Sequence, residues 1–418
     1  MSEGVSQLLP GRRQAVADTV VVIGLGYVGR PIARAAAGAG FSVIGFDLDA
    51  GACARAEAAW PRTSAAGRFS ATANAHELPD AGGWIIAVPT PLDAAGAPDL
   101  GAVRAALASI APRLAPGALV TLVSTCQPGA TRGLCAPALD RQGLRIGHDT
   151  FLAVSPEREN PGHRAGLRET PRLLGALDDA SLVVAERFWR RLADHVVPVA
   201  SAEIAECAKL LENTYRLVNI ALMGELHAAF TALGVPTAEV VRAAATKPFG
   251  FQPFWPGLGA GGHCIPVDPV YLQGEARRVG AASSLLDAAL RANTDRADVV
   301  AERIAAHFGG VLHGRRIIVA GVCYKPDVAD LRCSAAVRLL RLLDAAGAVV
   351  CWHDPVVGAA PAELAGFTRC VAMAGGGFDA AVLGVPHRAF TPTALMDAAP
   401  VLFDPFGVLP RGDGVVSV

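Results

Sequence analysis

The feature that most constrains this chain is a glycine-rich turn placed between a buried strand and a helix. Residues 19–23 (TVVVI) form a continuous apolar, β-branched run, which is typical of a strand buried on both faces. The motif GLGYVG (residues 24–29) follows at once, and a helical stretch runs to about Gly40. A second strand over residues 41–46 ends at Asp47. The complete unit predicts a Rossmann-type dinucleotide site.

Each part of this unit has its own role in holding a dinucleotide. Gly24 permits the tight turn, Gly26 lets a pyrophosphate approach the backbone, and Gly29 lets the helix pack against the strand. The helix N-terminus directs N–H groups at the phosphates. Asp47 lies where a carboxylate would bond the ribose hydroxyls and repel a 2′-phosphate. Because residues 48–52 (LDAGA) contain no arginine, the sequence predicts NAD rather than NADP.

Two further strand-like segments end in turns that contain a hydroxyl group and a proline. They are residues 84–91 (WIIAVPTP) and 118–129 (ALVTLVSTCQPG). In a parallel sheet such strand ends face the ligand crevice, so Thr90 and Thr125 are candidate ligand contacts. For either threonine alone, a turn or cap role explains the residue better.

Composition excludes several classes of function. The 418 residues are too many for one core, and a net charge of −1 with 18% charged residues gives no electrostatic bias towards nucleic acid or anionic membrane. Glycine, proline or arginine interrupts every apolar run before the ~18 residues that a membrane helix needs. Residues 1–18 contain no long apolar core, so we expect a flexible tail rather than a secretory signal.

The cysteines point to a reducing compartment. All nine are scattered and none forms a C-x-x-C pair, which argues against a zinc site and a disulfide framework. Most are expected to be buried apolar thiols. We therefore expect a cytoplasmic protein without a bound metal.

Residues 203–233 are predicted to form one long helix that stops at Gly234. Its apolar stripe consists of Leu211, Val218, Leu222 and Leu226. At ~1.5 Å per residue the helix spans more than about 40 Å, and a helix of that length often carries a dimer interface. Lys209 and Asn213 lie four residues apart and share one face, although a solvated surface explains such a pair equally well.

A second glycine-rich segment, residues 255–268 (WPGLGAGGHCIPVD), ends in a cysteine and an aspartate four residues apart, and we call it the cysteine loop. A cysteine after a Gly-Gly turn and near a helix start is placed for a lowered pKa and nucleophilic attack. The spacing alone fits a nucleophile and a structural thiol equally well at Cys264. His263 is expected to be structural, because nothing pairs it with Cys264 as a base.

The carboxy-terminal third repeats the strand–loop–helix pattern without the glycine motif. Residues 315–321 (RRIIVAG) begin the unit, a helix follows over 334–346, and strands follow over 349–355 and 379–385. The fold class is therefore α/β, with two Rossmann-like doubly wound domains joined by a central helical domain that includes the long connecting helix. The expected limits are a tail at 1–18, an NAD-binding domain at 19–200, a central helical domain with the cysteine loop at 201–305, and a second Rossmann-like domain at 306–418.

Seven motifs together resemble one known family. GLGYVG, VPTP, STCQPG, SPEREN-PG, AKLLENTYR, GGHCIPVDP and GVCYKPDVADLR occur in the order and spacing of the UDP-glucose/GDP-mannose dehydrogenase family, from about residue 19 to about residue 410. The run from ATKPFGFQPFWPG to GGHCIPVDPVYL is most similar to the bacterial UDP-N-acetylglucosamine 6-dehydrogenase branch.

The resemblance implies a four-electron oxidation of a sugar CH₂OH through a thiohemiacetal and a thioester on Cys264. Asp268 and Lys209 match the pair that orders a water, and Asn213 matches their amide partner. Glu157 matches the acid/base of thioester hydrolysis, and Thr125 a hydroxyl near the same water. An alcohol oxidation needs a proton acceptor, and the oxyanions need a cation and an amide donor. Glu159 has no clean counterpart.

The resemblance also implies two sets of ligand contacts, a sugar-nucleotide-binding role for the domain at 306–418, and a homodimer formed through the central domain at 201–305. The NAD contacts are Gly24, Gly26, Tyr27, Val28, Gly29, Asp47, Thr90, Thr125 and Arg332. The contacts to a nucleoside-diphosphate sugar are Glu157, Arg158, Lys209, Asn213, Phe254, Gly261 and Lys325.

Some positions depart from the family pattern. They are Val123, Gly224, Val385-Pro386 and Phe406, and a loop motif between Asp47 and Trp84 is lost. Because they lie at the ligand periphery, the sugar remains open between a UDP-N-acetylhexosamine, UDP-glucose and dTDP-glucose. Two alternatives remain, a two-electron Rossmann dehydrogenase and a catalytically degenerate nucleotide-sugar binder. The product would enter cell-surface polysaccharide biosynthesis or a secondary metabolite.

Overall fold

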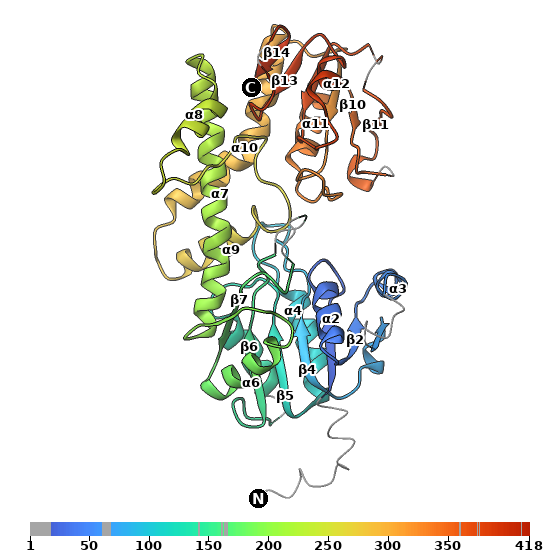
Figure 1. Ribbon diagram of the computed structural model, residues 1–418, viewed down its shortest axis with the longest axis vertical. Coiled ribbons are helices and arrows are strands. Elements are labelled where there is room, and N and C mark those ends of the chain that lie inside the picture. Colours follow the sequence, from blue (N-terminus) through green and yellow to red (C-terminus); the bar gives the residue numbers. More distant parts are fainter. Residues whose placement is uncertain are drawn as a thin grey trace, which may run out of the picture. The chain divides into compact units, whose positions relative to one another are not determined.

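The computed structural model describes residues 18–60, 68–140, 143–159, 162, 166–358, 361–373, 375, 377–410 and 412–418 (Figure 1). The chain divides into two compact units, the first ending at Leu211 and the second beginning at Glu212. Almost all of the predicted tail, residues 1–17, lies outside the described residues.

The first unit contains an eight-stranded sheet among its described residues, in the order β3-β2-β1-β4-β5-β6-β7-β8. The strands are β1 (Thr19–Ile23), β2 (Ser42–Phe46), β3 (Arg68–Thr72), β4 (Ala81–Ile86), β5 (Leu114–Leu122), β6 (Thr150–Val154), β7 (Arg172–Ala176) and β8 (Val196–Pro198). The β6–β7 pair is antiparallel and the other pairs are parallel. Its helices are α2 (Gly29–Gly38), α3 (Ala50–Ala58), α4 (Gly101–Ile110), α5 (Ala136–Asp140) and α6 (Asp179–Trp189).

Strand β1 lies at the centre of this sheet, as its β-branched sequence predicts. The side chains of Val20 and Val22 are completely buried, and they join a core that includes Ile32 of α2 and Trp189 of α6. The two segments predicted to end in turns do so, because β4 ends at Ile86 and β5 at Leu122. The residues VPTP and STCQPG form loops beyond these strand ends.

Helix α7 (Ala202–Ala232) has 31 residues and passes from the first unit into the second. At ~1.5 Å per residue it is about 46 Å long, in agreement with the predicted long connecting helix. Its buried face includes Leu210, Leu217 and Ala221. Leu211 and Leu222 of the predicted apolar stripe are instead more than 45% exposed in the single chain, at 63% and 48%.

The second unit contains a six-stranded parallel sheet among its described residues, in the order β11-β10-β9-β12-β13-β14. The strands are β9 (Arg316–Ala320), β10 (Val349–His353), β11 (Thr368–Arg369), β12 (Ala380–Leu383), β13 (Leu402–Asp404) and β14 (Val415–Ser417). The helices after α7 are α8 (Thr237–Ala244), α9 (Asp268–Arg278), α10 (Ser284–His307), α11 (Ala335–Ala345) and α12 (Pro392–Met396).

The core of the second unit joins its sheet to two helices. Ile317 and Val319 of β9 pack with Ile304 of α10 and Leu340 of α11, and all four side chains are completely buried. The two Rossmann-like sheets and the helical segment between them confirm the predicted fold class. Within the described residues, no helix has the length and apolar character needed to cross a membrane.

Candidate functional site

The glycine loop after β1 has the geometry that a dinucleotide needs. Gly24 has a φ of +93°, and a Cβ added there would lie 2.3 Å from the carbonyl oxygen of Ala87. A Cβ at Gly29 would lie 1.7 Å from the carbonyl oxygen of Gly24, so α2 approaches β1 as closely as glycine allows. Gly26 differs, because a Cβ there would meet no atom within 4 Å. The open space at Gly26 fits the approach of a pyrophosphate to the backbone.

Asp47 lies directly after β2 and beside the glycine loop. Its Oδ2 accepts a hydrogen bond from the Leu25 N–H at 2.8 Å, and its Oδ1 accepts one from the Asp49 N–H at 3.0 Å. The side chain is half-buried, and each carboxylate oxygen can still accept a second hydrogen bond. The carboxylate is thus held where it would bind the ribose hydroxyls of NAD. Tyr27 is 50% exposed, and Val28 directly precedes α2.

The loops after β4 and β5 are hydrogen-bonded to one another at the carboxyl ends of these strands. The Ser124 hydroxyl donates to the carbonyl oxygen of Val88 at 2.7 Å, so the loops that carry Thr90 and Thr125 are joined by one hydrogen bond. Both threonine side chains are half-buried. Glu206 of α7, which the sequence did not single out, supports the second loop by accepting from the Thr131 N–H at 2.8 Å and the Thr131 hydroxyl at 2.6 Å.

Glu157, after β6, is a fully engaged carboxylate. Its Oε1 accepts from the N–H groups of Arg158 and Glu159, at 2.7 and 2.8 Å. Its Oε2 pairs with the buried Arg172 guanidinium at 3.1 Å. Burial alone would raise the pKa of Glu157, but the Arg172 charge and these hydrogen bonds hold that pKa below its ordinary value. The Arg158 side chain bonds the carbonyl oxygen of Pro171 at 2.7 Å.

Glu159, two residues further on, has the opposite environment. Its Oε1 is buried and receives no hydrogen bond from the described residues. Burial, and then the negative charge of Glu157, raise the pKa of Glu159 to about 7. This carboxyl group can therefore gain and lose a proton near neutral pH, which Glu157 does not do.

Cys264 lies in the turn that leads into α9. Its carbonyl oxygen accepts from the N–H groups of Val267 and Asp268, at 3.1 and 2.8 Å, and its side chain is half-buried. Asp268 is the first residue of α9 and is buried, and its Oδ2 accepts from the Asn213 side chain at 2.5 Å. Three of the predicted catalytic residues therefore lie together in the second unit. Lys209, one helical turn before Asn213 on α7, is buried within the first unit.

Two residues of α10 fix the glycine-rich segment that precedes the cysteine. The Asn293 side chain accepts from the Ala260 N–H at 2.6 Å and donates to the Ala260 carbonyl oxygen at 3.1 Å. The buried Arg296 donates to the Gly257 carbonyl oxygen at 3.0 Å. The sequence analysis missed both. A polar pair three residues apart on the buried face of a helix is the signal that could have found them.

Apart from Asn213 on α7, the predicted substrate contacts of the second unit lie on two neighbouring loops, together with the predicted cofactor contact Arg332. The Phe254 ring is buried and packs edge-on against Tyr215, with the ring centres 5.7 Å apart. Burial, and then the positive charge of Arg216, lower the pKa of Lys325. Arg332 forms an ion pair with Asp330 at 2.6 Å. A Cβ added at Gly261 would lie 2.6 Å from the carbonyl oxygen of Cys333, which leaves no room for a side chain.

Comparison with known proteins decides the family. The sequence matches the NAD binding domain of the UDP-glucose/GDP-mannose dehydrogenase family over residues 18–193, the central domain over 203–295 and the UDP binding domain over 318–411. It is 35% identical over 386 residues to UDP-N-acetyl-D-glucosamine 6-dehydrogenase from Pseudomonas aeruginosa, which covers 89% of this chain and 91% of that protein. The chain belongs to the UDP-glucose/GDP-mannose dehydrogenase family.

Other relatives agree with this assignment. A UDP-N-acetyl-D-mannosamine dehydrogenase from Pyrococcus horikoshii is 31% identical over 362 residues, covering 81% of this chain and 84% of that protein. The solved structure of a UDP-D-ManNAc dehydrogenase from the same organism has a TM-score of 0.85 and 27% identity, and covers 96% of this chain and 98% of its own. The comparisons confirm the predicted family, the enzyme class of NAD-dependent nucleotide-sugar dehydrogenase and the cofactor NAD.

The positions that depart from the family pattern are accommodated in the structure. Val123 is buried, and a Cβ added at Gly224 would lie 3.4 Å from the Arg296 side chain. Phe406 packs against Gly257, since a Cβ there would lie 2.9 Å from its ring. Val385 is buried. Gly224 lies against Arg296, which donates to the Gly257 carbonyl oxygen, and Phe406 lies against Gly257 itself. Both departures therefore lie next to the start of the cysteine loop.

Proposed function

We propose that this enzyme oxidises the C6 hydroxymethyl group of a UDP-N-acetylhexosamine to a carboxylate. The relatives at 30–35% identity are named UDP-N-acetyl-D-glucosamine 6-dehydrogenase and UDP-N-acetyl-D-mannosamine dehydrogenase, which supports this substrate class. The balanced reaction converts RCH₂OH, two NAD⁺ and one water into RCOO⁻, two NADH and three protons. UDP-glucose and dTDP-glucose are the competing substrates, because the departures near the cysteine loop can alter sugar preference.

The observation that carries this proposal is the cysteine loop, followed directly by the buried Asp268 that is paired with the half-buried Asn213. The Cys264 carbonyl accepts from the Asp268 N–H at the start of α9, which fixes the backbone that carries the thiol. In the proposed mechanism the Cys264 thiolate adds to the aldehyde carbon, forming a C–S bond and a thiohemiacetal. After the second hydride leaves that carbon, a thioester remains. Water then attacks the thioester, breaks the C–S bond and returns the thiol.

Bound NAD⁺ supplies the hydride acceptor for both oxidation steps. The Gly26 opening would hold its pyrophosphate and Asp47 its ribose, with Thr90, Thr125 and Arg332 as the further predicted contacts. The preference for NAD over NADP follows from the Asp47 carboxylate, which repels a 2′-phosphate.

The chain's own polar groups would stabilise the intermediates. Lys209 supplies a cation and Asn213 an amide donor for the oxyanions of the thiohemiacetal and the tetrahedral intermediate. Asp268 accepts a proton or orders the attacking water. Glu157, held ionised by Arg172, suits a fixed electrostatic or hydrogen-bond-accepting role near that water, with the Thr125 hydroxyl beside it. Glu159, with its pKa raised to about 7, is the better proton donor and acceptor at this end of the sheet.

The nucleoside diphosphate would bind the second unit. Burial and the positive charge of Arg216 both disfavour the charged form of Lys325, and a diphosphate bound at Lys325 would favour it. Phe254 and Gly261 would line the sugar site and Arg158 its far end. We propose domain limits of 19–200, 201–305 and 306–418 for the cofactor, central and nucleotide parts.

A homodimer is proposed through α7. One row of apolar side chains on this helix is exposed in the single chain, namely Ile204, Leu211, Tyr215 and Leu222 at 46–63%. Single soluble chains seldom leave a continuous apolar row in water, and a second copy of the same helix would cover it. Replacing Leu211 and Leu222 with glutamate should halve the mass measured by light scattering. A wild-type mass of one chain would contradict the dimer.

The cell location and pathway are also proposals. All nine cysteines are free thiols, which fits the reducing cytoplasm. A uronic acid product fits a precursor of cell-surface polysaccharide, or of a secondary metabolite.

The proposal is tested with a panel of UDP-, dTDP- and GDP-sugars supplied with NAD⁺. The highest kcat/KM should fall on a UDP-N-acetylhexosamine, with a 6-carboxylate as the product by mass spectrometry. Cys264→Ala should bind NAD⁺ normally yet yield no sugar acid. Normal acid output from Cys264→Ala would contradict the thioester mechanism.

A further inference from the structure

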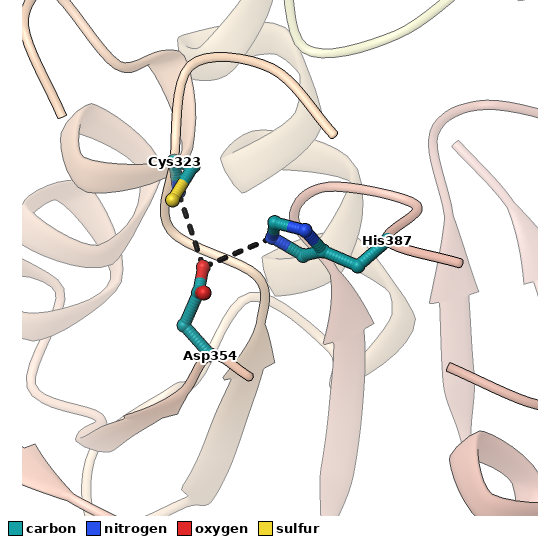
Figure 2. Close-up of side chains that lie close together, drawn as sticks. All are labelled: Cys323, Asp354 and His387. Carbon is teal, nitrogen blue, oxygen red and sulfur yellow. Dashed lines mark hydrogen bonds and ion pairs between the residues drawn. The ribbon is translucent and has the colours of Figure 1, made fainter. Parts of the chain in front are cut away.

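A buried cluster of three side chains lies at the carboxyl ends of the central strands of the second sheet. Cys323 follows β9, Asp354 follows β10 and His387 follows β12, and all three are at most 2% exposed. Their potential metal-binding atoms lie within 4.8 Å of one another. Figure 2 shows Cys323 and His387 on two sides of the Asp354 carboxylate. Cysteine, aspartate and histidine can together bind a metal ion. The directions of their hydrogen bonds decide between a metal site and a hydrogen-bonded cluster.

The direction of the histidine hydrogen bonds argues against a metal. The backbone N–H of Asp327 donates to His387 Nδ1 at 2.9 Å, so that nitrogen carries a lone pair and no proton. The ring proton must then be on Nε2, which donates to Asp354 Oδ2 at 3.0 Å. A histidine that binds a metal through one nitrogen donates the N–H of the other, and here the other nitrogen accepts. The three side chains therefore form a hydrogen-bonded cluster rather than a metal site.

Asp354 is the centre of this cluster. Its Oδ2 accepts from the N–H groups of Val322 and Cys323, and its Oδ1 from those of Val356 and Val357, at 2.8–3.3 Å. Burial would raise the pKa of Asp354, but the hydrogen bond from His387 and those from the backbone hold that pKa well below its usual range. Burial and the Asp354 carboxylate raise the pKa of Cys323 to about 12, so Cys323 stays a neutral thiol.

The cluster holds one segment, residues 321–334, which we call the β9–α11 loop. Asp354 binds the N–H groups at its start, and His387 binds the Asp327 N–H in its middle, where Asp327 adopts a φ of 60°. The Ser334 hydroxyl closes the loop by donating to the Val322 carbonyl oxygen at 2.7 Å. A non-glycine residue with a positive φ is stable only where its surroundings fix it.

The β9–α11 loop in turn supports the cysteine loop. The Gly262 N–H donates to the Arg332 carbonyl oxygen at 3.0 Å. A Cβ added at Gly262 would lie 2.8 Å from the Tyr324 ring, so the turn two residues before Cys264 lies directly on this ring. A displacement of the β9–α11 loop would therefore move the backbone that carries the thiol.

We propose that His387 and Asp354 are positioning residues that hold Cys264 in place through the β9–α11 loop. This inference rests on the proposed role of Cys264 as the nucleophile. A displacement of about 1 Å at a reacting group can lower a rate by about 100-fold, so a visible loss of kcat is expected when this support is lost.

The test compares His387→Ala and His387→Gln with wild-type enzyme. The alanine variant loses both hydrogen bonds, whereas the glutamine amide can still donate to Asp354. We expect His387→Ala to lower kcat, measured with NAD⁺ and nucleotide sugar at saturation, at least about tenfold. His387→Gln should recover part of that loss. The rate at which iodoacetamide alkylates Cys264 without ligands, followed by peptide mass spectrometry, should differ from the wild-type rate more in His387→Ala than in His387→Gln.

Leu395→Ala is the matched control. Leu395 is buried on α12 in the same unit, in a different core cluster from the one that includes Cys323. Its loss should lower stability while kcat and the alkylation rate stay at wild-type values. Equal effects of His387→Ala and Leu395→Ala on kcat, at equal loss of stability, would overturn the positioning role.

Two further outcomes separate this inference from its premises. One zinc ion per wild-type chain by elemental analysis, lost in His387→Ala, would overturn it in favour of a metal site. If wild-type enzyme oxidised no nucleotide sugar, the proposed function would fail, and the alkylation rates alone would decide the inference. Unchanged alkylation in His387→Ala would then overturn it, and changed alkylation would support it.

Discussion

The two sheets solve the same geometric problem in the same way at their central strands. Gly24 follows β1 with a φ of +93°, and Gly321 follows β9 with a φ of +86°. Each N–H donates to the last residue of the neighbouring strand, Gly24 to Phe46 at 2.8 Å and Gly321 to His353 at 2.7 Å. In both places a Cβ would lie within 2.6 Å of a carbonyl oxygen, which leaves glycine as the residue that fits.

An aspartate follows the second strand in both sheets. Asp47 accepts from the Leu25 N–H, and Asp354 accepts from the Val322 N–H, both at 2.8 Å. The two carboxylates then differ in what surrounds them. Asp47 is half-buried beside the open space at Gly26, whereas Asp354 is 1% exposed and surrounded by donors.

The strand registers show what fills the second site. Ile23 pairs with Ile86 in the first sheet, and Ala320 pairs with Leu383 in the second, so Thr90 and His387 hold equivalent places four residues beyond. By the same count Cys323 stands at the place of Gly26. One topology therefore yields two different sites at the carboxyl ends of the central strands. In the first sheet this site is open to a dinucleotide, and we call it the open edge. In the second sheet it is filled by protein side chains, and we call it the filled edge. Fold alone does not assign function here.

The largest expected effect of this contrast is on stability. Asp354→Ala should lower the free energy of unfolding by about 3–5 kcal/mol, because it leaves four backbone N–H groups and His387 without their acceptor. Urea unfolding measures the change. A loss below about 1 kcal/mol would show that the filled edge is not held by its carboxylate.

The matching substitution in the first sheet should act on the cofactor instead. Asp47→Ala should lower stability less than Asp354→Ala does, because the half-buried Asp47 accepts from two backbone N–H groups rather than four. It should also remove the hydrogen bonds that the ribose hydroxyls would donate to this charged acceptor. Such bonds contribute about 1.5–3 kcal/mol, so Kd for NAD⁺ should rise by about 10- to 100-fold. Calorimetric titration of NAD⁺ tests this, with the Kd for NADP⁺ as the control. An unchanged Kd for NAD⁺ would contradict the assignment of the open edge.

Sequence reasoning predicted the open edge well, because its signals are local. The TVVVI strand, the three glycines and Asp47 lie within thirty residues, and each has a steric or electrostatic reason to be what it is. The length of α7 was also predictable from its apolar periodicity. The face of α7 that would be buried in a single chain was not, since Leu211 and Leu222 point to solvent.

The filled edge and the supports of the cysteine loop were not predicted, because their partners are distant in sequence. His387 and Asp354 are 33 residues apart, and Asn293 lies 33 residues from Ala260. Polar residues of these types are exposed by default, and no periodicity marks the exceptions. Aligning the two strand–loop–helix units would have paired Asp47 with Asp354 and Thr90 with His387.

A paired substitution at equivalent places sharpens the contrast. Gly26→Ala should fold normally, since its Cβ meets no atom, but should raise Kd for NAD⁺ by occupying the space of the pyrophosphate. Cys323→Ala should leave Kd for NAD⁺ unchanged and lower stability by about 1 kcal/mol. The two proteins are compared by NAD⁺ titration and urea unfolding. Weaker NAD⁺ binding in Cys323→Ala would break the division between the edges.

The smallest effect expected is on pH dependence at the open edge. The pKa of Glu159 is raised to about 7 from an ordinary value near 4.5, so it opposes ionisation in the folded protein. Its contribution to stability is present below pH 4.5 and is lost as pH rises through 7. Glu159→Gln should therefore raise Tm relative to wild type at pH 8 and leave the difference near zero at pH 4. An equal difference at both pH values would contradict the raised pKa.

The proposed reaction is a four-electron oxidation in which NAD⁺ accepts both hydrides and Cys264 is the nucleophile. The number of NADH molecules formed per sugar consumed tests it most directly, with UDP-N-acetylglucosamine and excess NAD⁺. The account predicts two NADH and one uronic acid per sugar. One NADH per sugar would indicate a two-electron dehydrogenase, and none across the substrate panel would indicate a nucleotide-sugar binder; either result would contradict the account.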